Sequence, residues 1–155
     1  MKKQIVDIQS RREDQALKTF IDKKNIYEEY KKEHEELKKR LAEFRVWRAE
    51  ESTRVFDELK KEPVSKKELD KIKEKLAQYK FEELALAEEE MKLSTQLVTY
   101  EENKDKAYQE YQDKRIRKNK FEKVYKKTKA KAEYAKNKKE ENEIDEDMIL
   151  NFNLD

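Results

Sequence analysis

Apolar residues recur at alternating steps of three and four through most of the second half of the chain. Counted from Leu69, this alternation defines twenty positions up to Ala135, of which fourteen are apolar. A spacing that averages 3.5 residues is the heptad pattern of a helix that packs along one narrow stripe. One unbroken register predicts a single helix over about 66–139. The same alternation occurs less regularly upstream, from Tyr27 to Phe44, and predicts a first helix over about 3–61.

Between the two heptad segments lies the only proline of the chain, Pro63. Proline lacks the N–H that a preceding helix needs and disfavours helical geometry in the residue before it, so the first helix must end near Lys61. Ser65 and Glu68 then form a capping-box pattern that begins the second helix. A turn over 62–65 between two heptad helices predicts an all-α antiparallel coiled-coil hairpin, with residues 1–155 as a single elongated domain.

The turn also predicts which residues face each other. If it sets the register, facing positions have residue numbers that add to about 127. Tyr30 then faces Leu97, and an acid meets a base where Glu13 faces Lys114. The same register places the Arg48 guanidinium over the ring of Tyr79.

The composition disfavours a catalytic globule. Charged residues make up 49% of the chain, and there are no glycines and no cysteines, as is typical of long helices. Two helices that meet along one seam do not enclose the concave pocket that an enzyme needs. His34, the only histidine, falls on a seam position, and no metal-ligand spacing is present. We therefore expect no enzyme activity, cofactor or metal site. We also expect no membrane span or signal peptide, and hence a cytoplasmic protein.

Charge is distributed unevenly near the end of the chain. Residues 114–139 contain thirteen Lys or Arg and two Glu, whereas residues 140–155 contain seven acids and no base. In the predicted register, residues beyond about 126 have no partner helix, so a basic end is left uncovered and the acidic tail is free to fray. A solvated helix face is the simpler interpretation of such a run, and a partner-binding surface is the alternative.

A second candidate surface lies in the first helix, where Phe44, Val46 and Trp47 fall within four residues. A two-stranded seam buries only a narrow stripe, so Val46 and Trp47 should lie wholly or partly outside it. Tyr79, Phe81 and Leu84 lie near them in the predicted register. Aromatic and arginine side chains are typical interface anchors, which favours partner binding. The alternative is a local stutter that turns Trp47 into the seam.

The segments Phe44–Glu51 (FRVWRAEE) and Pro63–Asp70 (PVSKKELD), followed by a charged helix, a Lys-rich stretch and an acidic tail, carry a resemblance. The chain resembles the YscO/SctO family of bacterial type III secretion stalk proteins. That family is similar to the flagellar export protein FliJ and, more distantly, to the gamma subunit of rotary F-type ATPases.

The resemblance implies a non-catalytic central stalk, cytoplasmic and peripheral at the inner membrane. Such a stalk couples a hexameric secretion ATPase to the cytoplasmic domain of the export gate, and secretion chaperones are further implied partners. It needs no small-molecule substrate and inserts into no membrane.

The resemblance also implies roles for particular residues. The turn signals described above, Pro63, Ser65 and Glu68, would lie toward the export-gate end of such a stalk. The export gate or a chaperone would contact residues of the aromatic region: Phe44, Val46, Trp47, Arg48, Glu51, Tyr79 and Phe81. The ATPase ring would contact basic residues of the second helix: Lys114, Arg115, Arg117, Lys118 and Lys120.

Two other functions fit the same pattern. A generic coiled-coil adaptor, or an escort protein that binds chaperones, would have the same hairpin without an ATPase partner. The lysine-rich stretch with interleaved tyrosines could also bind nucleic acid, although lysine dominates over arginine and the acidic tail would compete for the same surface.

Overall fold

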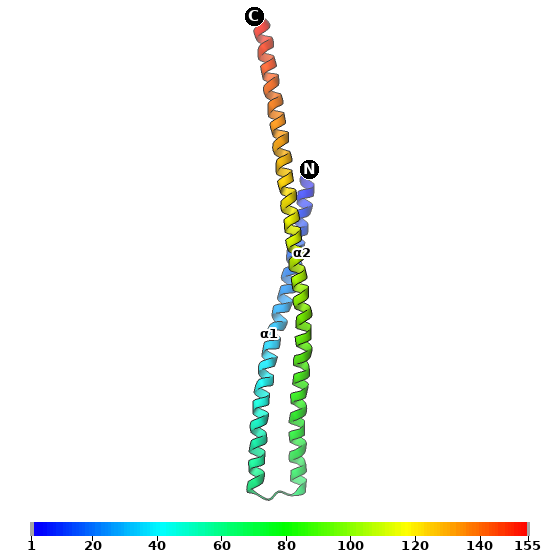
Figure 1. The fold of residues 1–155 in the computed structure, drawn as a ribbon, viewed down its shortest axis with the longest axis vertical. Helices are drawn as coiled ribbons and strands as arrows, with labels where there is room; N and C mark the ends of the chain where they lie inside the picture. The colour runs from blue at the N-terminus through cyan, green and yellow to red at the C-terminus, as the bar shows by residue number, and fades with distance from the viewer. Residues whose placement is uncertain (1, 155) are drawn as a thin grey trace. The chain divides into compact units, whose positions relative to one another are not determined.

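The computed structural model describes residues 2–154, and the side chains of residues 2–151. It contains two helices, α1 (Lys3–Lys61) and α2 (Lys66–Leu154), joined by one short link (Figure 1). No strand occurs in this described part of the chain. Contacts between α1 and α2 are those of a helical hairpin, so the predicted all-α fold is confirmed.

The link between the helices forms as its residue types require. The Ser65 hydroxyl accepts a hydrogen bond from the backbone N–H of Glu68 at 3.2 Å, and the Ser65 carbonyl accepts the first helical bond from Leu69 at 3.0 Å. Ser65 is therefore the N-cap of α2, as predicted. Pro63 lies in the non-helical link, where its missing N–H leaves no helical bond unmade.

The chain divides into two compact units. Unit 2 comprises residues 21–105 and contains the turn, and unit 1 comprises residues 1–20 and 106–155. In unit 2, Tyr30 of α1 contacts Tyr100 of α2, and Trp47, further along α1, contacts Tyr79, which comes earlier in α2. The two helices are therefore antiparallel. Leu37 and Leu41 are the buried apolar residues of its seam.

In unit 1, the described residues of α1 up to Phe20 pack against the part of α2 that begins at Lys106. The Phe20 and Tyr108 rings lie 5.2 Å apart, and Lys118 Nζ lies 2.8 Å from Glu13 Oε2. Ala107 and Gln9 are buried there. These contacts are also antiparallel, so the hairpin pairing is found in both units.

Two of the predicted side-chain contacts are displaced by about one helical turn, whereas Trp47 meets Tyr79 within one residue of the predicted register. Tyr30 stacks on Tyr100 with ring centroids 4.7 Å apart, not on Leu97, and Glu13 pairs with Lys118, not with Lys114. Helical side chains point back toward the N-terminus of their own helix. In an antiparallel pair, residues slightly further toward both C-termini therefore meet, which is the observed direction of displacement.

α2 extends past its predicted end near 139 and runs to Leu154. No glycine or proline interrupts this stretch, and lysine, alanine and glutamate are strong helix formers. Every described side chain from 126 to 151 is exposed. In Figure 1 this orange-to-red part of α2 continues past the start of α1 as one helix without a partner, as the register predicts.

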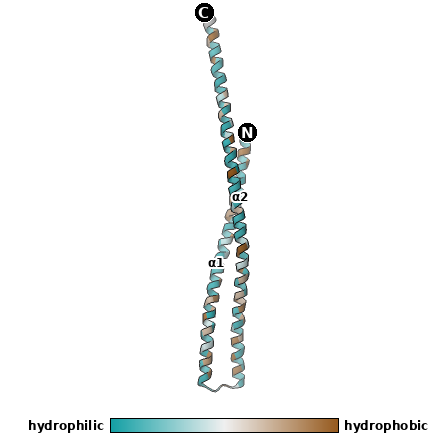
Figure 2. Cartoon of the chain, viewed as in Figure 1, coloured by the Kyte–Doolittle hydropathy of each residue, from teal (hydrophilic) through white to brown (hydrophobic). Residues whose placement is uncertain are grey.

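Residues coloured as hydrophobic are sparse along both helices and occur as separate short bands of the ribbon (Figure 2). Because the core is this thin, one buried leucine should matter. We predict that Leu41→Ala lowers the free energy of unfolding by about 2 kcal/mol, the low end for a buried leucine. Leu41 is 6% exposed, whereas Leu84 on α2 is 56% exposed.

The matched control is Leu84→Ala, which should change stability by less than about 0.5 kcal/mol. Urea denaturation followed by circular dichroism measures both values. Equal losses in the two variants would contradict the seam described above.

Candidate functional site

Three aromatic rings meet at the middle of unit 2, and we call Phe44, Trp47 and Tyr79 the aromatic patch. Phe44 and Trp47 lie one turn apart on α1, with ring centroids 5.6 Å apart, and the Trp47 ring meets Tyr79 of α2 edge-on at 4.8 Å. Trp47 remains 42% exposed. Trp47 therefore contacts a ring of the opposite helix while part of its side chain faces solvent, so it lies partly outside the seam, as predicted.

Two arginines of α1 hold one carboxylate of α2 beside the aromatic patch. Arg45 Nε donates a hydrogen bond to Glu83 Oε1 at 3.0 Å, and Arg48 Nε lies 2.6 Å from Glu83 Oε2. The Arg48 contact is an ion pair without an aligned hydrogen bond. Arg48 thus contacts Glu83 rather than lying over Tyr79, and it is Trp47 that packs against that ring. These contacts fix the helices on both sides of Trp47.

Apolar side chains also line the outer face of α2, away from the seam. Phe81 is 75% exposed, and Leu84, Met91 and Val98 are exposed in the same way. We call these four residues the outer stripe. Leu84, Met91 and Val98 are spaced by seven, so they share one helix face. On α1, Val46 is exposed and lines a shallow groove with Trp47.

A cavity of about 320 Å³ lies between the helices near the turn. Its apolar walls include Val55, Leu59, Ile72 and Leu76. Glu51, Pro63, Glu68 and Tyr79 also line it. The structure therefore brings together turn residues and aromatic-region residues that are far apart in sequence.

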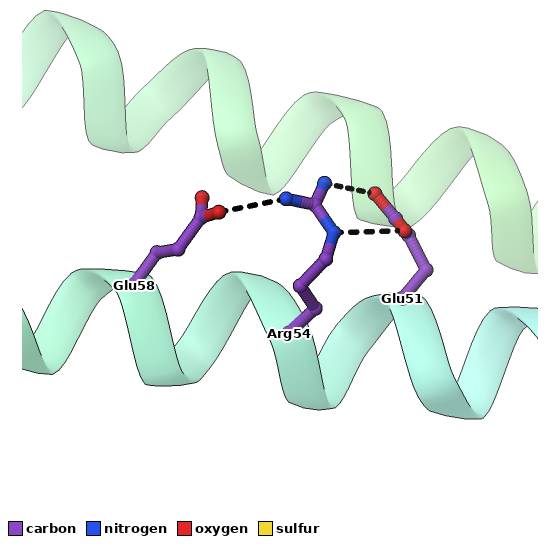
Figure 3. Close-up of polar contacts among 3 residues, drawn as sticks. All are labelled: Glu51, Arg54 and Glu58. Carbon is purple, nitrogen blue, oxygen red and sulfur yellow. Dashed lines mark hydrogen bonds and ion pairs between the residues drawn. The ribbon is translucent and has the colours of Figure 1, made fainter.

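An arginine on α1 bridges two acids at the edge of this cavity (Figure 3). Arg54 donates two hydrogen bonds to Glu51, from Nη2 at 2.5 Å and from Nε at 3.2 Å, and one to Glu58 from Nη1 at 2.7 Å. The bonds to Arg54 lower the pKa of the Glu51 carboxyl. The same contacts raise the pKa of Arg54, so both groups are charged at neutral pH.

The five predicted ring-contact residues of unit 1 differ in accessibility. Arg115, Arg117 and Lys120 are exposed, but Lys114 and Lys118 are half-buried against α1. Contact with the Glu13 carboxylate raises the pKa of Lys118. The structure therefore leaves Arg115, Arg117 and Lys120 available to a partner, whereas Lys118 holds the two helices of unit 1 together.

Several polar seam residues have partners that the sequence reasoning missed. His34, with a side chain 12% exposed, places Nε2 2.9 Å from Glu90 Oε1. Lys104 lies over the ring of Tyr27, with Nζ 4.4 Å from its centroid. The signal for both was present, because each pair joins seam positions of the two helices. Met91 and Val98 were also missed, although their spacing from Leu84 could have indicated them.

The described residues were also compared with the requirements of a metal site and of a membrane span. Within them, no group of three or more His, Cys, Asp or Glu side chains could hold a metal ion. No helix in the same part of the chain is long and apolar enough to cross a bilayer.

The fold and these surfaces define a class of helical-hairpin protein that presents exposed aromatic and basic faces. Comparison with known families identifies the particular family. The family model for type III secretion protein YscO matches residues 3–149, and the chain belongs to this family. A search of curated proteins found no match, and a search of solved structures found none either.

The Glu51 carboxyl provides a pH test of the cavity edge. We predict that it titrates with a midpoint below the ordinary value of 4.5, because Arg54 stabilises its charged form. This stabilisation is complete above pH 4.5 and is lost as the pH falls through the lowered pKa. Carboxyl carbon NMR over a pH series measures the midpoint.

Arg54→Gln should return the Glu51 midpoint toward 4.5. Arg45→Gln is the matched control, because Arg45 bonds to Glu83 instead, and it should leave the midpoint unchanged. A midpoint that does not respond to Arg54→Gln would refute the assigned cause.

Proposed function

We propose that this type III secretion protein is a non-catalytic central stalk that couples the hexameric secretion ATPase to the export gate. The observation that carries the proposal is that α1 does not cover the part of α2 after Tyr125, where every described side chain is exposed. Membership of the YscO family makes the secretion apparatus its setting. The stalk acts in the cytoplasm, peripheral to the inner membrane.

The basic face of α2 in unit 1 is the proposed contact with the ATPase ring. Arg115, Arg117 and Lys120 are exposed, and seven lysines follow between 126 and 139. A dense positive surface of this kind steers association with an acidic partner and makes it sensitive to salt. A ring whose pore is lined with acids would fit this surface.

The aromatic patch, with Val46, Arg48, Glu51 and Phe81, is the proposed contact with the export gate. Trp47 is 42% exposed, and its position is fixed by the contact with Tyr79 and by the neighbouring ion pairs to Glu83. A preorganised aromatic group loses little entropy when it binds, which is why such groups serve as anchors. Secretion chaperones are a second client of the same patch.

The coupling follows from symmetry. One asymmetric hairpin inside a sixfold ring cannot contact all six subunits alike, so each hydrolysis event changes which subunit holds it. Contacts that form and break repeatedly must be weak, and a charged surface with few apolar groups meets that requirement. The protein supplies no catalytic group to this cycle.

Charge reversal tests the ring contact. We predict that Arg117→Glu combined with Lys120→Glu lowers the association constant for the ATPase by about a hundredfold at low salt, since both charges face solvent and their reversal turns attraction into repulsion. Pull-down and titration with the purified ATPase measure the loss.

The control for net charge is Lys66→Glu combined with Lys67→Glu, at exposed positions beside the turn. At the same low salt it should leave ATPase association within about twofold, because these positions lie several Debye lengths from the proposed ring contact. If both pairs weaken association equally, the effect is one of net charge and the proposed ring contact is wrong. An ATPase that fails to bind the unmodified chain would favour a generic adaptor instead.

Truncation of the indole tests the gate contact. We predict that Trp47→Ala lowers capture of the export-gate cytoplasmic domain by at least about tenfold, the usual effect of removing an aromatic anchor. Tyr134→Ala removes a ring in unit 1 that is more exposed than Trp47, at 69% against 42%, and should leave gate capture unchanged. Circular dichroism confirms that both variants remain helical, and equal capture by both would overturn the assignment of Trp47.

A further inference from the structure

The last part of α2 has a surface that no other described part of the chain covers. All described side chains from 126 to 151, which we call the free segment, are exposed. Tyr134, Ile144 and Met148 are among them, each with more than half of its surface open to solvent. A helix without a packed face is marginal in water, so a partner for this segment would stabilise it.

The free segment has two halves of equal and opposite charge. Residues 126–139 contain seven lysines and Glu133, a net charge of +6, and residues 140–151 contain six acids and no base, a net charge of −6. The acidic half also lies at the C-terminal end of the helix, where no basic residue occurs in the last turn. Negative charge there opposes the helix dipole, so a cationic partner would relieve a real penalty.

The apolar residues of the free segment are arranged symmetrically. Two apolar residues precede Lys139, Ala130 by nine positions and Tyr134 by five. Two follow it at the same distances, Ile144 after five positions and Met148 after nine. With Asn137 and Glu141 between them, they follow alternating steps of four and three and therefore share one helix face. This stripe maps onto itself when the helix direction is reversed about Lys139.

We propose that the free segment pairs with the same segment of a second copy of this chain, antiparallel and centred on Lys139. Tyr134 then faces Ile144 of the second copy, Ala130 faces its Met148, and the basic half of each copy lies along the acidic half of the other. Reversing the direction is essential, because a parallel pair would place the two basic halves together and the two acidic halves together.

Individual charge pairs follow the same symmetry. In an antiparallel pair each flank of the stripe faces the same flank of the second copy, so Lys131 lies opposite Asp145. Glu133 opposite Asp147 is an unfavourable pair, and Lys138 and Glu140, each opposite the same residue of the second copy, are also unfavourable. Exposed pairs each contribute little, so the attraction comes from the net charge of the halves. About 39 Å of paired helix with one thin apolar stripe gives a weak, salt-sensitive interface.

This self-association goes beyond the proposed stalk role and does not rest on it. The paired state covers the seven lysines between 126 and 139, which extend the basic face assigned to the ATPase ring. A free protein in this state would hold that part of its surface away from other acidic partners until a stronger one displaced the second copy.

Cysteine crosslinking of the full-length chain tests the arrangement, because the protein has no cysteine of its own. Ala130→Cys and Met148→Cys variants, one of them isotopically labelled, are mixed at low salt and oxidised. We expect the mixed disulfide and little disulfide in either variant alone. Two Ala130 positions in an antiparallel pair are about 27 Å apart along the axis, beyond the reach of a disulfide.

Same-residue disulfides would indicate a parallel pair and overturn the proposal. A variant that carries both Ala130→Cys and Met148→Cys supplies a further test. A disulfide within one molecule of it would mean that the segment folds back on itself, and would also overturn the proposal. Absence of the mixed disulfide, together with a monomer mass at low salt in analytical ultracentrifugation, would overturn it as well.

Charge exchange supplies an independent arm. Lys131→Glu with Lys138→Glu should raise the dissociation constant of self-association by at least about tenfold, and Glu140→Lys with Asp147→Lys should do the same. An equimolar mixture of the two variants should associate again, because each reversed half then meets a complementary one. Failure of the mixture to recover would overturn the proposed pairing.

Discussion

The structure depends on a seam that is one heptad stripe wide. Two helices can bury only the residues that face each other, and Leu37, Leu41 and Ala107 are the buried apolar side chains among the described residues. Every further large apolar group is left partly or wholly in water. The aromatic patch and the outer stripe are consequences of this geometry, because a narrow seam has no room for them.

Polar groups in the seam are tolerated because side chains of the opposite helix pair with them. Glu83 is held by Arg45 and Arg48, Glu90 by His34, and Lys104 by the ring of Tyr27. These sites are only partly buried, so the desolvation cost of each charge is moderate. A shift by one heptad would separate every one of these pairs, so together they favour one register over its neighbours.

The unequal lengths of the helices decide which charges remain available. α1 covers α2 as far as Tyr125, and within that covered part Glu13 ties down Lys118. After Tyr125, α2 carries first lysines and then acidic residues, and no other part of the described chain contacts this segment. A secretion protein built in this way exposes charge that its own core does not use, since the free segment and the buried seam share no residues.

Local chemistry allowed much of the fold to be predicted. Heptad spacing, the proline and the Ser65 cap act within a few residues of their own positions, so both helices and the turn could be inferred before any contact was known. The tertiary structure alone decided which side chains meet. Tyr30 reaches Tyr100 and Glu13 reaches Lys118 because helical side chains lean by about a turn, and heptad arithmetic does not include that reach. Arg48 could equally have lain on Tyr79 or on Glu83, and only packing placed Trp47 against the tyrosine and the guanidinium on the carboxylate.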